Sequence, residues 1–329
     1  METKYYIAVH RDDKVWKRSS SGGAFSAITD AWLAAYGEKA SIYGCAFDGE
    51  LNALHIRATT AAERNQMCGS KYIGSNTTGV YRDVARDLQN GMHVCFSGTP
   101  CQIGALKSYL RVAGIQPEDR LLTVDFICHG VASTRFFRDY LDVLEKKYGS
   151  KAISCTFRAK SRPERRQDIQ VGFANGKSFL SRSTRYDWFY AVYFRNLNLR
   201  PACYGGRYAS EQRCADITIA DHWDVKTFYD KAKSLLLVST PLGELWTQKA
   251  LADMDWTEVQ HQAQTSIQSR KPGDYDAFWK TYLEQGYFAA QKLVGNNTLA
   301  GKAKYHLVSL ADDLHILSAL KKIRILLRR

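Results

Sequence analysis

The chain has 329 residues, of which 45% are hydrophobic and 24% charged, and this composition excludes a mainly disordered protein. The formal net charge of +13 favours an anionic partner such as a phosphorylated cofactor, a phosphorylated substrate or an acidic membrane surface. Much of the excess charge lies in residues 158–166 and 321–329, and neither segment carries a known DNA- or RNA-binding pattern, so we expect no nucleic-acid partner.

Alternating helices and strands are predicted for the first half of the chain. The periodicity and turn residues predict helices at 24–36, 76–90, 101–112 and 133–147, and strands at 40–47, 92–96 and 121–127. Such alternation is typical of an α/β fold with a mostly parallel sheet and flanking helices. We therefore expect an N-terminal α/β lobe over residues 1–150.

Shorter β-like segments follow after residue 150. Strands are predicted at 153–157, 169–173, 216–220 and 235–240, with a hairpin at Asn175-Gly176, and helices at 243–254 and 274–285. The pattern predicts a second, α+β lobe over residues 151–300.

The last segment, residues 301–329, is predicted to be a basic amphipathic helix. Leucines recur at helical spacing from residue 307 to residue 320, and lysines and arginines gather at the end of the chain. Such a helix can dock on the protein core, with its terminal cations complementing the helix dipole. It can also lie on an anionic membrane, so we expect peripheral membrane contact through residues 304–329 as one interpretation.

The protein is expected in the cytoplasm. Its N-terminus has no apolar signal region, and no window approaches the about 20 apolar residues that cross a bilayer. Cytosolic reductants keep thiols reduced, so the 8 cysteines are predicted to be thiols or metal ligands.

Four cysteines are candidate metal ligands. Cys101 and Cys128 follow predicted strands, so both fall at the carboxyl edge of the sheet, where ligands bind in α/β folds. Cys203 and Cys214 lie in the second lobe. The alternative is that each is a small buried apolar residue, because no Cys-x-x-Cys pair supports a tight metal site.

Two segments suit a phosphate-bearing cofactor. Ser19 to Gly23 precede a helix, where hydroxyls and backbone N–H groups can hold a phosphate. The segment from Ser70 to Ser75 adds Lys71 and Tyr72 before another helix. Each segment could instead be a capped surface loop.

Seven segments taken in order resemble the coenzyme F-420 hydrogenase/dehydrogenase beta-subunit family, in particular a bacterial branch found with polysaccharide-assembly genes. They are SSSGGAFSA, GSKYIGS, VCFSGTPCQIGALKSYL, VDFICHGVAS, FRAK, NLNLRPACYGGRYA and RCADITIADHW, and they cover roughly residues 18 to 240. The resemblance implies FAD, a 4Fe-4S cluster and electron transfer to an organic acceptor.

The resemblance also implies roles for individual residues. The implied flavin-binding residues are Ser20, Ser21, Gly22, Gly23, Lys71, Tyr72, Ser75, Gly98, Thr99 and Pro100. The implied cluster ligands are Cys101, Cys128 and Cys203. Candidates for proton transfer or substrate contact are His129, Lys160, Asp221 and His222.

Two departures from the family pattern bear on the cofactors. We expect this chain to lack the family's ferredoxin-like segment, so electrons would come from an external donor, namely a ferredoxin, a deazaflavin or NAD(P)H. Gly206 stands where the family's second Cys-x-x-Cys thiolate is expected. A 4Fe-4S cluster usually takes four thiolates, so Cys214 supplies the fourth, one iron stays open, or the cluster has been lost.

The sequence thus predicts an FAD-dependent and possibly iron-sulfur oxidoreductase that acts on a small-molecule, glycan or lipid-linked substrate in surface-polysaccharide or glycoconjugate assembly. One alternative is a scaffold that kept the fold without redox chemistry. Another is a transferase acting on nucleotide- or lipid-linked sugars, for which basic patches would suit a diphosphate.

Overall fold

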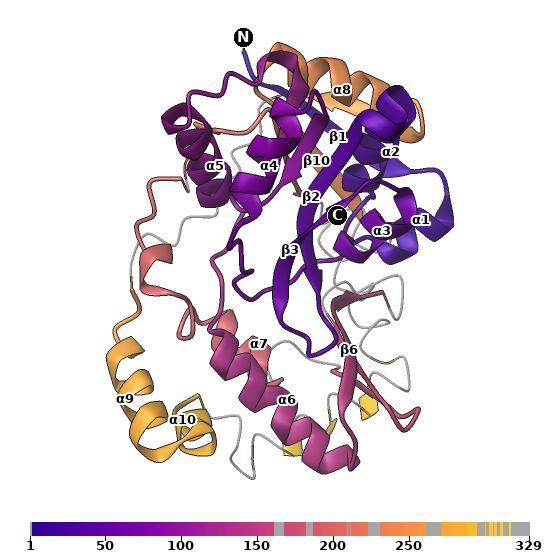
Figure 1. The fold of residues 1–329 in the computed structure, drawn as a ribbon. Helices are drawn as coiled ribbons and strands as arrows, with labels where there is room; N and C mark the ends of the chain where they lie inside the picture. The colour runs from indigo at the N-terminus through magenta and orange to yellow at the C-terminus, as the bar shows by residue number, and fades with distance from the viewer. Residues whose placement is uncertain are drawn as a thin grey trace.

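An eight-stranded mixed sheet forms the centre of the molecule in the computed structural model (Figure 1). The described residues are 2–160, 168–181, 187–208, 210, 212–222, 231–260 and 271–294, with isolated residues between 300 and 316. The strands of the large sheet are β1 (Lys4–His10), β2 (Ala40–Phe47), β3 (Ala53–Ala58), β4 (His93–Ser97), β5 (Leu121–Phe126), β9 (Ile217–His222), β10 (Lys233–Val238) and β11 (Met254–Val259).

The strand order is β11-β1-β10-β9-β5-β4-β2-β3. The four central strands β9, β5, β4 and β2 run parallel, whereas β3 at one edge and β10, β1 and β11 at the other pair antiparallel. The predicted α/β class is therefore confirmed, with a parallel centre and antiparallel edges.

Ten α-helices surround this sheet or join the smaller lobe in the described part of the chain. They are α1 (Asp13–Arg18), α2 (Ala24–Tyr36), α3 (Ala61–Arg64), α4 (Val80–Gln89), α5 (Pro100–Val112), α6 (Thr134–Tyr148), α7 (Trp188–Tyr193), α8 (Pro241–Leu251), α9 (Tyr275–Gln285) and α10 (Tyr287–Leu293). Four short 3-10 helices connect them: η1 (Gly37–Lys39), η2 (Asn65–Met67), η3 (Glu118–Arg120) and η4 (Pro201–Cys203).

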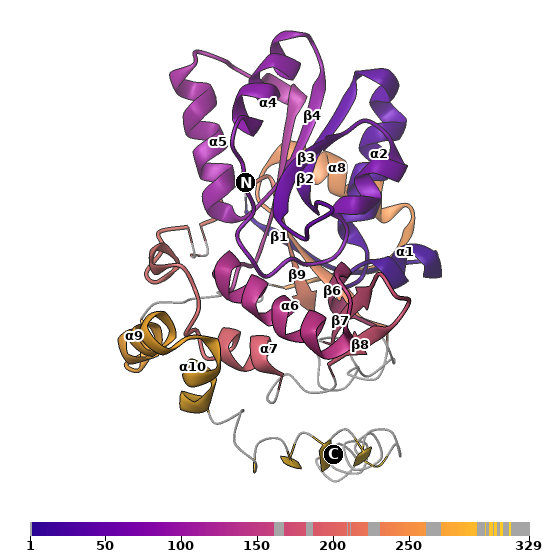
Figure 2. The same ribbon diagram turned by 60° about the horizontal axis from the view of Figure 1, so that its bottom comes forward.

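Side-chain alternation along the strands builds a core on each face of the sheet. On β4, Val94 and Phe96 pack against α4 and α5, whereas Cys95 between them packs with Trp32 of α2 and Trp246 of α8. Figures 1 and 2 show these helix pairs on opposite sides of the sheet. The sheet is therefore covered on both faces, as a parallel centre requires.

Local sequence explains where the helices next to the parallel strands begin. Gly23 has a φ of 98°, a left-handed conformation that favours glycine, and it caps α2. Thr99 caps α5 through a capping box with Gln102, and Pro100 occupies the first turn, where its missing N–H costs nothing. Both caps lie at the end of the sheet that carries the predicted site.

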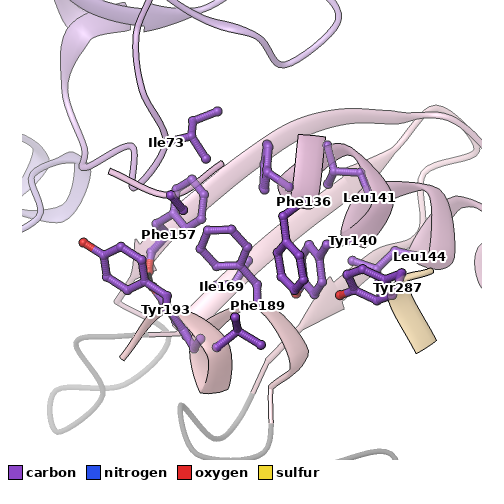
Figure 3. Close-up of a cluster of buried hydrophobic side chains, with 14 of the residues drawn as sticks. Ile73, Phe136, Tyr140, Leu141, Leu144, Phe157, Ile169, Phe189, Tyr193 and Tyr287 are labelled. Atoms are coloured by element: carbon purple, nitrogen blue, oxygen red, sulfur yellow. Dashed lines mark hydrogen bonds between the residues drawn. The ribbon is translucent and has the colours of Figure 1, made fainter. Parts of the chain in front are cut away.

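A second, smaller lobe lies beside one end of the large sheet (Figure 2). It contains an antiparallel sheet of β6 (Ala152–Ala159), β7 (Asp168–Phe173) and β8 (Ser178–Leu180), together with α6, α7, α9 and α10. An aromatic core holds it together, and Figure 3 shows Phe136, Phe157, Phe189, Tyr193 and Tyr287 gathered there. The antiparallel sheet and these helices form the expected α+β lobe.

The two lobes are not formed by separate halves of the chain that meet at residue 150. Residues 217–259 return from the small lobe and supply β9, β10, α8 and β11 to the large sheet, so residues 151–300 are shared between the two parts. Residues 301–329 lie largely outside the described residues, and those described between 303 and 316 are helical. None of the helices in the described part of the chain could cross a bilayer.

Candidate active site

A cavity of about 380 Å³ lies where three distant segments meet. Its walls come from residues 17–20 at the end of α1, residues 65–71 around η2, and residues 155–160 at the end of β6, together with Gln170 of β7. The cationic side chains in the wall are Lys17, Arg18, Lys71, Arg158 and Lys160, and no Asp or Glu is among the described lining residues. The cavity is therefore suited to an anion.

Part of the Ser-Gly-Gly segment lines the cavity, and part of it binds the large sheet. Ser20 lines the cavity, and its Oγ accepts a hydrogen bond from the backbone N–H of Ser70 at 2.7 Å. Ser21 and Gly22 instead bind β10: Ser21 Oγ donates to the Lys233 carbonyl, and Gly22 N–H donates to Ser234 Oγ. Of the four flavin-binding residues predicted here, the structure places only Ser20 in the cavity wall.

Lys71 lines the cavity, but its ammonium group has backbone partners. Its Nζ donates to the carbonyls of Gln66, Met67 and Cys68 at 3.2, 3.0 and 3.1 Å, which accounts for all three N–H donors. Burial lowers the pKa of Lys71. Lys71 thus orders the wall and adds to its positive field, whereas the predicted direct contact with a phosphate would require breaking one of these bonds.

Lys160 and Arg158 are also held by protein groups. Lys160 Nζ donates to the carbonyls of Trp16 and Ser21 at 2.5 and 2.7 Å and lies 4.1 Å from the centre of the Trp16 ring. Arg158 makes two hydrogen bonds to Asp221 of β9, at 2.6 and 3.2 Å. The predicted catalytic candidates Lys160 and Asp221 therefore position the cavity wall.

Arg18 and Asn65 are functional candidates that the sequence did not suggest. Arg18 lines the cavity and makes no ion pair or hydrogen bond with a described residue. Asn65 lines it too, and its buried Oδ1 has no hydrogen-bond partner among the described residues. Buried polar atoms usually have a partner, so a ligand donor would satisfy this one. Arg18 ends the short helix α1, and Asn65 follows the short helix α3. Both features are common in proteins, so neither indicates a site from the sequence.

Cys101 follows β4, Cys128 follows β5 and Cys203 ends η4, and both Cys101 and Cys203 are near enough to Cys128 to act on it electrostatically. The Gly130 N–H donates to Cys128 Sγ at 3.4 Å, and a Cβ built on Gly130 would lie 3.3 Å from Cys203 Cβ. Burial raises the pKa of Cys128 to about 12, and negative charge on Cys101 or Cys203 would raise it further. Cys101 is exposed.

Cys214 has different neighbours. Its Sγ donates to the Pro100 carbonyl at 3.3 Å, and the side chain packs against the apolar cluster beneath α4 and α5. The predicted meeting of all four sulfur atoms is therefore not seen, because Cys214 turns toward that cluster. Within the described ranges, no group of three His, Cys, Asp or Glu residues is arranged to hold a metal ion.

Tyr72 and Tyr193 connect the cavity side of the molecule with the three cysteines. Their rings stack at 4.9 Å, and burial raises the pKa of Tyr72, which lies close to the cavity residue Arg158. The Tyr193 hydroxyl donates a hydrogen bond to the Gly130 carbonyl, and the centre of the Tyr193 ring lies 5.1 Å from the centre of the His129 ring. His222, the remaining catalytic candidate, lies on β9 opposite Lys233.

The predicted residues Ser75, Gly98, Thr99 and Pro100 do not line the cavity. Ser75 belongs to a buried network in which Gln102 donates to Ser75 Oγ and the Thr99 N–H donates to Gln102 Oε1, both at 2.9 Å. His55 of β3 completes it, with Nδ1 3.0 Å from Ser75 Oγ and Nε2 3.0 Å from the Ser97 carbonyl. The network fixes the start of α5, the helix that carries Cys101.

His55 is neutral in this network, and its tautomer follows from its partners. The Ser97 carbonyl can only accept, so Nε2 carries the proton and Nδ1 accepts from the Ser75 hydroxyl. Burial lowers the pKa of His55 to about 4. The alternation of the segment ALHIRA was the available signal for this strand, and the sequence prediction missed it.

Comparisons with known proteins agree with this architecture. A family model for the C-terminal region of the beta subunit of coenzyme F420 hydrogenase/dehydrogenase matches residues 91–263, more than half of the chain. A chain in the xenon-derivatised F420-reducing NiFe hydrogenase complex from Methanosarcina barkeri has a similar structure, with a TM-score of 0.53, 18% sequence identity and 89% of each chain covered. The latter likeness shows the fold alone. A search of curated proteins found no match.

Proposed function

The chain belongs to the coenzyme F420 hydrogenase/dehydrogenase beta-subunit family, and we propose that it is an FAD-dependent oxidoreductase whose cationic cavity receives the cofactor's diphosphate. Bound FAD would supply the redox chemistry, because its isoalloxazine ring can take up and release electrons.

The observation that carries this proposal is the composition of the cavity wall. Five cations line a volume of about 380 Å³, which is within the range of small-molecule sites. Three of the cations are already held by protein groups, so the cavity keeps its positive charge at fixed positions. A preorganised cationic site binds a diphosphate without first rearranging its own side chains.

Each residue of the cavity wall would contact the cofactor in its own way. Arg18 can donate two parallel hydrogen bonds to phosphate oxygens, and the hydroxyls of Ser19 and Ser70 lie in the same wall. Arg158, fixed by Asp221, contributes positive charge from β6. The Asn65 amide oxygen accepts a hydrogen bond from a donor on the cofactor.

The proposed path of the electrons includes no iron-sulfur cluster. Cys128 and Cys203 lie near each other, but a 4Fe-4S cluster usually takes four thiolates, and Cys214 donates a hydrogen bond to the Pro100 carbonyl instead. In this arrangement of the described residues the cysteines do not fit the cluster. Electrons would enter from an external donor, such as a reduced ferredoxin, a deazaflavin or NAD(P)H.

The resemblance to the polysaccharide-linked branch of the family supports a substrate class. We propose that the acceptor is a glycan or lipid-linked intermediate of surface-polysaccharide or glycoconjugate assembly.

Replacing Arg18 tests the assignment of the cavity. Arg18→Gln removes a charge-assisted hydrogen-bond donor and should weaken FAD binding roughly tenfold. Lys14→Gln is the matched control, because Lys14 is an exposed cation on the same helix that does not line the cavity. Titration of FAD into the flavin-free protein, followed by flavin fluorescence, measures both variants. Equal weakening of binding in the two variants would show that the diphosphate lies elsewhere.

A further inference from the structure

The wall of the cationic cavity offers no surface that suits an aromatic ring system. Among its described lining residues there is no aromatic residue and no Leu, Ile, Val or Met, and the side chains other than the cations are small or polar. Adenine and isoalloxazine rings usually lie against aromatic or apolar side chains. The cavity therefore suits the polar middle of the cofactor, where the diphosphate joins the sugar groups.

Two neutral polar side chains of the small sheet line this cavity together. Thr156 of β6 pairs directly with Gln170 of β7, and we call these two residues the neutral pair. Directly paired residues on antiparallel strands project from the same face of the sheet, with their Cβ atoms about 5 Å apart. Neither the hydroxyl nor the amide of the neutral pair has a hydrogen-bond partner among the described residues. Both groups can donate as well as accept a hydrogen bond.

A diphosphate alone does not match these neutral groups. Its oxygens accept hydrogen bonds, whereas the amide oxygens of Gln170 and Asn65 can be satisfied only by a donor. The buried Oδ1 of Asn65 has no partner among the described residues, and Asn65 lines the same cavity. Sugar hydroxyls donate as well as accept, and in FAD they lie next to the diphosphate. They therefore match the groups in the wall that phosphate oxygens leave unsatisfied.

We propose that the cavity binds sugar hydroxyls of the cofactor as well as its diphosphate, and that the neutral pair makes the cavity specific for a sugar ester of diphosphate. This inference rests on the proposed function, because it assigns what lies beside the diphosphate in the same site. The cations would attract the diphosphate, whereas the neutral pair would distinguish a sugar-bearing ligand from a bare diphosphate. The hydroxyls belong either to the ribose of the adenosine half or to the ribityl chain of the flavin half.

Calorimetric titration of the flavin-free protein with FAD and with inorganic pyrophosphate tests the neutral pair. Thr156→Val with Gln170→Leu removes its polar groups and nearly keeps the side-chain volumes. This double variant should bind FAD about tenfold more weakly, and its pyrophosphate binding should stay within about twofold of the native value. Arg18→Gln should weaken the binding of both ligands, because both have phosphate oxygens.

A matched control changes the same residue types elsewhere. Thr257→Val with Gln89→Leu replaces exposed residues of β11 and α4 that do not line the cavity, and it should bind both ligands like the native protein. If the first double variant unfolds, Thr156→Val alone exchanges a hydroxyl for a methyl group and should give a smaller loss of FAD binding, again without a loss of pyrophosphate binding.

Nucleotide analogues identify which sugar is bound. If it is the ribose, the native protein should bind 2′,3′-dideoxyADP about tenfold more weakly than ADP, and the double variant of the neutral pair should bind the two alike. If it is the ribityl chain, the native protein should bind ADP and 2′,3′-dideoxyADP alike, and the double variant should bind FMN more weakly than the native protein does.

Three results would contradict the inference, and they differ in what they leave standing. Native-like FAD binding by the double variant would overturn it and leave the diphosphate assignment intact. Equal losses of FAD and pyrophosphate binding in that variant would also overturn it, because the neutral pair would then only shape the cavity. A native protein that binds neither FAD nor pyrophosphate would overturn the proposed function itself, and this inference with it.

Discussion

At the scale of single residues, most of the charged groups in the site position other groups. Lys71 and Lys160 bind backbone carbonyls, and Arg158 is paired with Asp221. Arg18 lines the cavity and has no hydrogen-bond or ion-pair partner among the described residues. The motifs placed Lys71 and Lys160 among the candidate site residues. Their hydrogen-bond partners are backbone atoms, for Lys160 from a distant segment, and a sequence pattern does not specify those.

His55 should make stability depend on pH. Its pKa is about 4 in the folded protein and about 6.5 in an unfolded chain, so the unfolded state binds more protons between these values. The free energy of unfolding should therefore fall as the pH drops from about 7 to about 4, by up to about 3 kcal/mol from this residue. Urea unfolding of the native protein and of His55→Gln over this range measures the difference.

The native protein and His55→Gln should differ in how steeply the free energy of unfolding changes with pH, as well as in its value at neutral pH. His55→Gln lacks the titrating group, so its unfolding free energy should change less with pH, although the variant is less stable at neutral pH because it loses part of the network around Ser75. Parallel pH dependences for the two proteins would show that His55 is not the neutral, buried group described here.

At the scale of elements, local signals predicted some boundaries closely and missed others. The helix at 24–36 and the strand at 40–47 have the predicted ends, because a left-handed glycine caps the helix and the strand is a continuous buried run. Strands β1, β3 and β11 were missed, and β8 was indicated only by the hairpin signal before it. The side chains of β11 are almost all exposed, so no apolar alternation marks it, and it forms because it pairs with β1, almost 250 residues earlier.

Gly22 lies in close contact with the backbones of β1 and β10. A Cβ on this residue would lie 2.3 Å from the Ala8 carbonyl oxygen of β1 and 2.4 Å from the Ser234 nitrogen of β10, and backbone cannot move aside as a flexible side chain can. We expect Gly22→Ala to lower the free energy of unfolding by about 1–3 kcal/mol. Gly49→Ala is the control, because a Cβ there meets nothing within 4 Å. Equal unfolding midpoints for the two variants would show that β1 and β10 do not approach Gly22 so closely.

At the scale of the whole molecule, the fold class and the family followed from the sequence, whereas the chain path did not. Ordered motifs and alternating elements predicted an α/β fold of the deazaflavin-hydrogenase type, and the family match confirms that resemblance. The return of residues 217–259 to the large sheet depends on strand pairing across most of the chain, which local periodicity cannot reveal. For the same reason, the meeting of residues 17–20, 65–71 and 155–160 at one cavity became visible only in the folded molecule.

The cationic cavity should make this chain a flavoprotein. Extraction of protein purified without oxygen, followed by chromatography against FAD and FMN standards, tests the claim most directly. We expect FAD, bound in a ratio near one per chain or taken up to that ratio when FAD is added. Protein that contains no flavin and binds none when FAD is supplied would contradict it and would favour a scaffold that kept the fold without the redox chemistry.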